Sequence, residues 1–210
     1  MLAGHLFLAC RTLAAMSAPA LGLRERKKEA TRQALHEAAV RLAVEHGLEG
    51  LTVEAIADAA DVSRRTFSNY FANKEEALLH SDQVRLRRLL DLVRERPPDE
   101  QPEQMLATAA RELVAGDTSD PRWIAQVRLL RRHPSLLARQ VAQYADAERA
   151  LADLVAERLP ADPDRALRAR LLAAGLLTTM RVAVQHWIED PSSSLPEVLD
   201  RALTLPRSAP

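Results

Sequence analysis

Residues Thr52–Leu78, TVEAIADAADVSRRTFSNYFANKEEAL, contain two helix starts in close succession. Thr52 and Ser63 are favoured N-cap residues, because a hydroxyl oxygen there accepts a hydrogen bond from a backbone N–H of the first turn. Each precedes a short helical pattern, VEAIADAA and RRTFSNYF, and Asp61 and Val62 form a tight connection between the two. Two short helices joined in this way predict a helix-turn-helix.

The second short helix has two different faces. With a turn of about 100° per residue, Phe67, Tyr70 and Phe71 fall on one side, which we expect to pack inward. The opposite side carries basic and polar residues and no acid: Arg65, Ser68 and Asn69, flanked by Arg64 and Thr66. Guanidinium, amide and methyl groups read base edges in the major groove of DNA. The sequence therefore predicts a DNA-recognition surface on this helix.

Neighbouring residues complete the predicted contact set. Thr52 and Ser63 place helix N-termini and hydroxyls where phosphates can bind. Tyr70 can direct its hydroxyl, and Lys74 its ammonium group, toward the DNA backbone. The residues expected to contact DNA are therefore Thr52, Ser63, Arg64, Arg65, Thr66, Ser68, Asn69, Tyr70 and Lys74.

The rest of the chain is expected to be helical as well. Ala, Leu, Arg and Glu dominate the 210 residues, Gly is scarce at 6, and no convincing strand pattern occurs. The predicted fold class is therefore all-α, and 47% hydrophobic residues are enough for an ordered core. Beside the two short helices, we expect helices at residues 23–47, 74–96, 103–115, 121–132, 134–159, 164–189 and 196–203.

The overall charge does not exclude a nucleic-acid partner. The chain has 29 basic and 29 acidic residues, so its formal net charge is zero, but a neutral total can hide a local basic patch. The start of the first long helix is basic: Arg24, Arg26, Lys27, Lys28 and Arg32. Basic charge there opposes the helix macrodipole, so either a phosphate backbone or simple solvation would have to favour it.

The segment 52–78 resembles the DNA-binding domain of the tetracycline-repressor (TetR) family. The matching residues are Thr52, Ile56-Ala57, Ala60, Val62-Ser63, Thr66, Tyr70-Phe71 and Lys74-Glu75, with Ala38-Ala39, Leu42 and Gly47 upstream. The resemblance covers roughly residues 30–79. The run RRTF is similar to a subset of actinobacterial members that includes regulators linked to the mycofactocin redox system.

Four positions depart from the usual pattern of that family. Asp61 stands where the family usually has Gly at the turn, and Asp tolerates a left-handed conformation better than most residues. Arg65 stands where Gly or Pro is common and Ser68 where an aromatic is common, so we expect the operator preference to differ there. Ala43 replaces a common Phe, which predicts a thinner core in the small domain.

The resemblance also implies the organisation of the whole chain. We expect a flexible extension at residues 1–22, a three-helix helix-turn-helix domain at 23–80, a helical ligand-binding and dimerisation bundle at 81–205, and a tail at 206–210. Residues 171–184 are apolar nearly all round, so this helix needs cover from its own bundle or from a partner subunit. Because one recognition helix reads few base pairs, a two-fold dimer that reads two half-sites is favoured.

A ligand pocket in the larger domain is implied in the same way. The candidate lining residues share a helical spacing and a large apolar or amide side chain: Met105, Trp123, Gln126, Val127, Tyr144, Leu176 and Met180. Each can equally be an ordinary core residue, because Met and aromatic residues at this spacing usually just pack.

No sequence signature of an enzyme, a metal site or a cofactor site occurs. The chain lacks a phosphate-binding Gly loop, a nucleophile elbow and an HExxH motif, and its six His have no ligand spacing. The single cysteine, Cys10, agrees with a reducing cytoplasm. Cys10 also leaves a lipoprotein anchor open, although Arg11 interrupts the apolar run that a signal peptide needs, and Met16 could be the true start.

These observations predict a cytoplasmic DNA-binding transcriptional regulator. The expected activity is ligand-responsive repression by a homodimer on a near-palindromic operator, without cofactor or membrane association. The alternative is a helical small-molecule-binding module that kept the fold without operator specificity. The acid-free face of the second short helix argues against that alternative.

Overall fold

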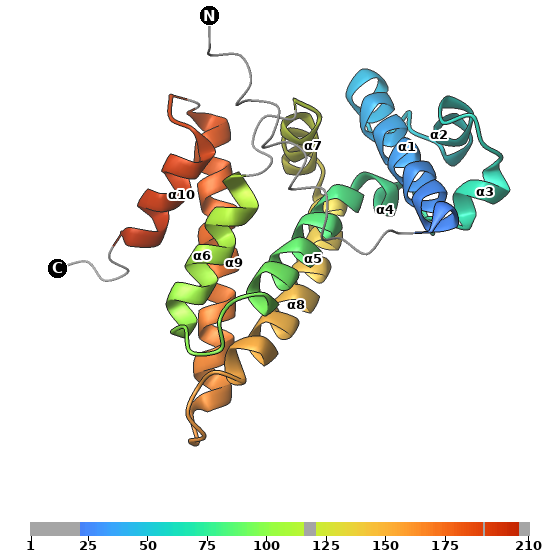
Figure 1. Ribbon diagram of the computed structural model, residues 1–210. Coiled ribbons are helices and arrows are strands. Elements are labelled where there is room, and N and C mark those ends of the chain that lie inside the picture. The colour runs from blue at the N-terminus through green and yellow to red at the C-terminus, as the bar shows by residue number, and fades with distance from the viewer. Residues whose placement is uncertain (1–21, 116–120, 191, 206–210) are drawn as a thin grey trace, which may run out of the picture. The chain divides into compact units, whose positions relative to one another are not determined.

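The computed structural model describes residues 22–115, 121–190 and 192–205, and in these residues every regular element is an α-helix (Figure 1). The predicted all-α fold is therefore confirmed. The helices are α1 (Leu23–His46), α2 (Val53–Ala59), α3 (Arg64–Ser68), α4 (Lys74–Leu78), α5 (His80–Arg94), α6 (Pro102–Ala115), α7 (Pro121–Arg132), α8 (Pro134–Ala156), α9 (Arg165–Glu189) and α10 (Leu195–Thr204). Residues 1–21 of the expected N-terminal extension, with Cys10 and Met16, and the expected tail at 206–210 lie outside the described residues.

The N-terminal part of α1, up to Ala34, belongs to a unit of its own. Every side chain from residue 23 to residue 30 is exposed. Lys28 pairs with Glu25 at 4.0 Å and Arg32 pairs with Glu29 at 3.6 Å. Ion pairs at or near the surface contribute about 0–1 kcal/mol each, so these contacts leave the basic character of the segment in place.

A first core, within residues 35–205, joins the end of α1 to α2, α3 and α4. Phe67 and Phe71 are 1% and 3% exposed, with ring centroids 5.9 Å apart, and they pack among Leu35, Ala39 and Ile56. The predicted inward face of the second short helix is therefore confirmed for these two rings. Tyr70 is only half-buried, at the edge of this core.

The turn between α2 and α3 has the backbone that the sequence predicts. Asp61 has φ of 53°, the left-handed region that favours Gly, and the Val62 N–H donates to the Ala57 carbonyl at 2.9 Å. Both predicted N-caps are confirmed as well. The Thr52 hydroxyl accepts from the Ala55 N–H at 3.1 Å, and the Ser63 hydroxyl accepts from the Thr66 N–H at 3.0 Å. These bonds fix where α2 and α3 begin.

The single helix expected at residues 74–96 is wrong, because the chain breaks it at Leu79 into α4 and α5. Ala77, Leu78, Leu79 and His80 are all buried in succession. Four consecutive residues of a straight helix point in directions about 100° apart and cannot all face one core. A local change of direction at Leu79, with φ −87° and ψ 4°, brings all four inside.

The remaining helices build a second core. Figure 1 shows α8 and α9 side by side, with α10 along α9, and α6 also packs on α9. Met105, Leu151, Ala173 and Leu195 are fully or almost fully buried at the centre of these contacts. α10 starts at a capping box in which the Glu197 side chain accepts from the Ser194 N–H at 2.8 Å. None of the described helices is both long and apolar enough to cross a membrane.

Candidate DNA-binding surface and ligand cavity

α3 is held firmly at its start and its inner side. The Ser63 hydroxyl accepts from the Thr66 backbone and also lies 2.9 Å from the Thr66 hydroxyl, while Phe67 anchors the opposite side in the core. Five residues are too few to form a stable helix alone, so these contacts supply the order that the recognition helix needs. A rigid α3 can present its outer side chains to a groove without first losing conformational entropy.

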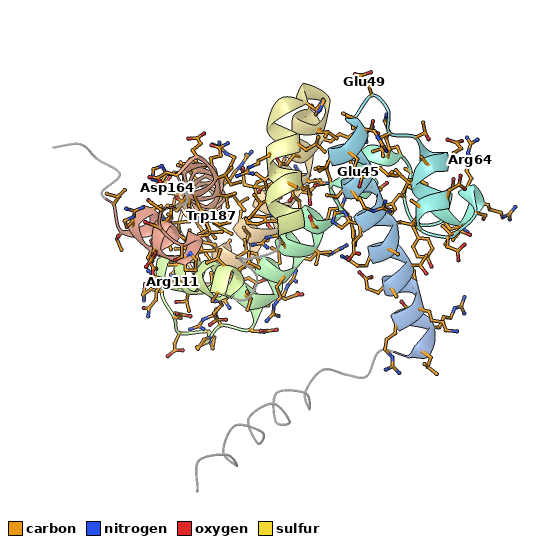
Figure 2. All side chains as sticks on the ribbon, turned by 90° about the horizontal axis from the view of Figure 1, so that it is seen from above. Glu45, Glu49, Arg64, Arg111, Asp164 and Trp187 are labelled. Carbon is orange, nitrogen blue, oxygen red and sulfur yellow. The ribbon has the colours of Figure 1, made fainter. Side chains whose placement is uncertain are left out.

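The sequence of α3 alone predicted an outer side without an acid, but the structure places one beside it. Arg64 pairs with Glu54 of α2, with 2.9 Å between Nη1 and Oε1, and Figure 2 shows Arg64 at the outer side of the helix-turn-helix. The prediction considered one helix in isolation, and the turn brings an acid from the neighbouring helix beside it. Both side chains are more than half exposed, so the pair is weak enough to exchange for a phosphate.

Arg65 and Asn69 remain available on this side. Both are exposed, and among residues 22–115, 121–190 and 192–205 the described contacts include no ion pair of Arg65. Asn69 is the C-cap of α3. Ser68 is also exposed, but its hydroxyl donates back to the Arg64 carbonyl at 3.3 Å. The strongest base-reading groups of the surface are therefore one guanidinium and one amide.

Lys74 lies in a different place from the one expected for a phosphate contact. Its Nζ donates to the carbonyls of Leu48 and Leu51 at 3.0 and 2.8 Å, and the side chain is partly buried. An ammonium group has three N–H donors, so at most one remains for DNA. Lys74 therefore ties the start of α4 to the loop after α1, and its contribution to DNA binding stays a prediction.

A cavity of about 330 Å³ lies among α5, α6, α7, α8, α9 and α10. Leu86, Leu89, Val127, Met180 and Leu199 are among its many apolar wall residues. This size and composition are typical of small-molecule sites in proteins. The cavity therefore agrees with the ligand-binding role expected of the larger domain.

One wall of the cavity is polar. Gln140 Nε2 donates to Asp82 Oδ2 at 2.6 Å, and the Arg85 guanidinium carbon lies 4.2 Å from the Trp123 ring centroid. Burial raises the pKa of Asp82, and its hydrogen bond to Gln140 and the charge of Arg85 oppose that rise. Burial also raises the pKa of Tyr144, and the negative charge of Asp82 raises it further. These groups can orient the polar end of a ligand.

The structure brings four of the seven candidate ligand residues together: Trp123, Val127, Tyr144 and Met180 line the cavity. Met105 and Leu176 do not line it and instead pack within the second core, at 0% and 3% exposure. Gln126 does not line it either. It is 1% exposed, and its Oε1 accepts from the Ser81 hydroxyl at 2.5 Å, so it joins α7 to α5.

Sequence reasoning missed the polar wall, namely Asp82, Arg85, Gln140, Arg181 and Gln185. One signal was available for Asp82. It stands four residues before Leu86 and seven before Leu89, on the same stripe of α5, and an acid within an apolar stripe is unusual. Among the described residues, no group of three or more His, Cys, Asp or Glu side chains is arranged to hold a metal ion.

Two family descriptions match this chain. Residues 35–80 match the bacterial regulatory proteins of the tetR family, and residues 100–208 match the MftR C-terminal domain. TcmR of Streptomyces glaucescens, an HTH-type transcriptional regulator, is 34% identical over 174 residues, which cover 79% of this chain and 76% of TcmR. MftR of Mycobacterium tuberculosis H37Rv, described as a mycofactocin biosynthesis transcriptional regulator, is 27% identical over 84% of this chain and 89% of its own length.

Solved structures agree on the fold. A TetR-family regulator of Streptomyces coelicolor superposes with a TM-score of 0.59 at 18% identity, covering 84% of this chain and 92% of its own. The SmeT–triclosan complex superposes with a TM-score of 0.57 at 20% identity, covering 86% and 97%. Among regulators of the tetR family, the chain resembles the mycofactocin-type regulators, as the run RRTF predicted. The helix-turn-helix, the helical bundle, the C-terminal match and the TcmR identity lead to one conclusion. This chain belongs to the tetR family of bacterial regulatory proteins and is a DNA-binding transcriptional regulator.

Proposed function

We propose that this regulator is a cytoplasmic repressor that binds a near-palindromic operator as a homodimer and leaves it when a small molecule occupies the cavity. We keep residues 23–80 as the proposed DNA-binding domain and residues 81–205 as the proposed ligand-binding and dimerisation domain. The proposal rests above all on one observation: α3 presents Arg65 and Asn69 outward from a capped helix whose inner side is fixed in a core.

The proposed DNA contacts divide into two kinds. Arg65, Asn69 and Thr66 are proposed to reach base edges, because their groups suit guanine, adenine and the thymine methyl. The backbone contacts are proposed for the remaining predicted residues: Thr52, Ser63, Arg64, Ser68, Tyr70 and Lys74. Of these, Arg64 must first leave Glu54, and Lys74 can offer only one further donor.

Support for a homodimer comes from apolar side chains that the bundle leaves in solvent. Leu167, Leu171 and Val182 of α9 are 59%, 62% and 46% exposed, while Ala169, Ala173 and Ala183 of the same helix are buried. A helix with apolar side chains on more than one side is stable when a second surface covers it. A partner's copy of the same face would provide that cover in a two-fold dimer.

Support for ligand response comes from three consecutive residues at the start of α5. His80 is 1% exposed in the first core, where its ring lies 5.4 Å from Phe71, and Ser81 donates to Gln126 of α7. Asp82 lines the cavity and accepts from Gln140 of α8. A ligand that changes the surroundings of Asp82 therefore acts within one helical turn of the DNA-binding core. Such a ligand would shift the population between conformations that fit and do not fit the operator.

Fluorescence anisotropy with DNA from upstream of the gene tests the DNA-binding part of the proposal. We expect tight binding that favours this DNA over scrambled DNA of equal length and weakens steeply with salt. The stoichiometry should be two chains per near-palindromic site. Equal affinity for both DNAs would instead favour the alternative function, a helical small-molecule-binding module without operator specificity.

A further inference from the structure

We infer that the cavity binds an amphipathic amine, with an apolar body among α5, α6, α7, α9 and α10 and a protonated amino group on Asp82. This inference rests on the proposed function, because it names the ligand class of the same cavity. Three features of the described cavity wall support the inference: a single carboxylate, an arginine already held on an aromatic ring, and the pH behaviour of the carboxylate.

Asp82 is the only acidic residue among the described residues that line the cavity. It is 7% exposed, and its described hydrogen-bond partner, Gln140, is a neutral amide. A carboxylate removed from water is costly until a positive group pairs with it. An amino group entering the cavity would supply the counter-charge at close range.

The aromatic wall of the same cavity already holds one cation beside Asp82. Trp123 and Tyr144 both line it, and the guanidinium of Arg85 already lies 4.2 Å from the Trp123 ring centroid. The electron-rich face of an indole attracts cations, and it does so more strongly when water is excluded. Trp187, labelled in Figure 2, stacks on Trp123 with 6.0 Å between the ring centroids and so fixes the orientation of that ring.

Two arginines of the cavity wall act against a cationic ligand, and both are restrained. Arg181 is exposed to solvent, which screens its charge, and it donates to Gln185 at 3.3 Å. Arg85 is held on the indole face of Trp123. Its attraction lowers the pKa of Asp82 less than burial raises it, so Arg85 offsets only part of the effect of burial on this carboxyl group. The negative charge of Asp82 likewise raises the pKa of Tyr144 more than the charge of either arginine lowers it.

The sign of the pH dependence follows from Asp82. The charged and titratable groups that line the cavity with it are Arg85 on α5, Tyr144 on α8 and Arg181 on α9, while α6, α7 and α10 contribute apolar side chains. Since burial raises the pKa of Asp82 above its ordinary value, an amine must displace a proton from any fraction that is protonated. Amine affinity should therefore rise with pH until the amine itself loses its proton near pH 10.

Isothermal titration calorimetry with octylamine, 1-octanol and octanoate tests the inference on the full chain without DNA. At pH 7 we expect octylamine to bind about 10-fold more tightly than 1-octanol or octanoate. Asp82→Asn should reduce that preference to about 2-fold, because the neutral amide keeps the shape and loses the charge. Asp153→Asn, which removes an exposed acid of α8 outside the cavity, should leave the preference unchanged.

The inference is overturned if octanol or octanoate binds as tightly as octylamine, if none of the three binds, or if Asp82→Asn keeps the preference. Should Asp82→Asn fail to fold, a wild-type series from pH 4 to pH 8 decides, because amine affinity must then increase with pH as Asp82 loses its proton. These titrations contain no DNA. Loss of operator binding would therefore refute the proposed function without changing their outcome.

Discussion

Replacing Arg65 by alanine should weaken operator binding and relax the base preference at one position of each half-site. Arg65 is exposed on α3, and the described contacts leave its guanidinium outside any ion pair. One bidentate contact to guanine contributes about 1–3 kcal/mol, which corresponds to about 5- to 150-fold in Kd per half-site. Arg64→Ala should cost less, because that side chain already pairs with Glu54 at 2.9 Å and must give up this pair to reach DNA.

The assay is fluorescence anisotropy on the upstream DNA and on a set of single-base variants, repeated at several salt concentrations. Arg88→Ala removes the same charge from an exposed position of α5 and serves as the matched control. Equal affinity and equal base preference of Arg65→Ala and Arg88→Ala would refute a base contact of Arg65. Equal weakening of every base variant by Arg65→Ala would also refute it, because that result would assign Arg65 to the phosphate backbone.

Three further predictions concern stability and pH. Asp61→Gly should raise the free energy of unfolding by about 0.5–1 kcal/mol in urea titrations, because φ of 53° strains an L-residue and suits Gly; a decrease would contradict the strain argument. Lys74→Ala should lower that free energy by about 1–3 kcal/mol, because the carbonyls of Leu48 and Leu51 each lose a charged donor; an unchanged urea midpoint would show that water replaces it. Because burial raises the pKa of Asp82, this residue contributes most to the free energy of unfolding below the ordinary carboxyl pKa. Its contribution falls as the pH rises through its pKa in the folded state. Asp82→Asn should therefore gain thermal stability relative to wild type between pH 4 and pH 7, and parallel melting curves would refute that sign.

The position of the helix-turn-helix was predictable because its signals are local. Thr52 and Ser63 cap helices within three residues of themselves, and Asp61 sets its own backbone conformation. The inward direction of Phe67 and Phe71 follows from helical periodicity alone. For such features, the chain neighbours already contain the physical cause, so their prediction needs no tertiary contact.

The break at Leu79 and the ion pair of Arg64 were not predictable in the same way. The chain turns at Leu79 because the first core buries residues 77–80 in succession, and a sequence pattern does not reveal that all four face the same core. Glu54 meets Arg64 because the turn sets the angle between α2 and α3. Both features depend on the directions of helices, which are set by packing.

The sequence by itself determined the helical class, the caps and turn of the DNA-binding motif and the residue types on its outer face. The tertiary structure alone decided which large side chains are core and which line the cavity. Met105 and Met180 have the same side chain and both lie within helices, yet of the two only Met180 lines the cavity. The structure also gathered Asp82, Gln140 and Tyr144, from two helices far apart in sequence, into one polar wall. The reason is physical: a cavity is the space that several helices leave between them, so its lining depends on their mutual packing and on no single segment.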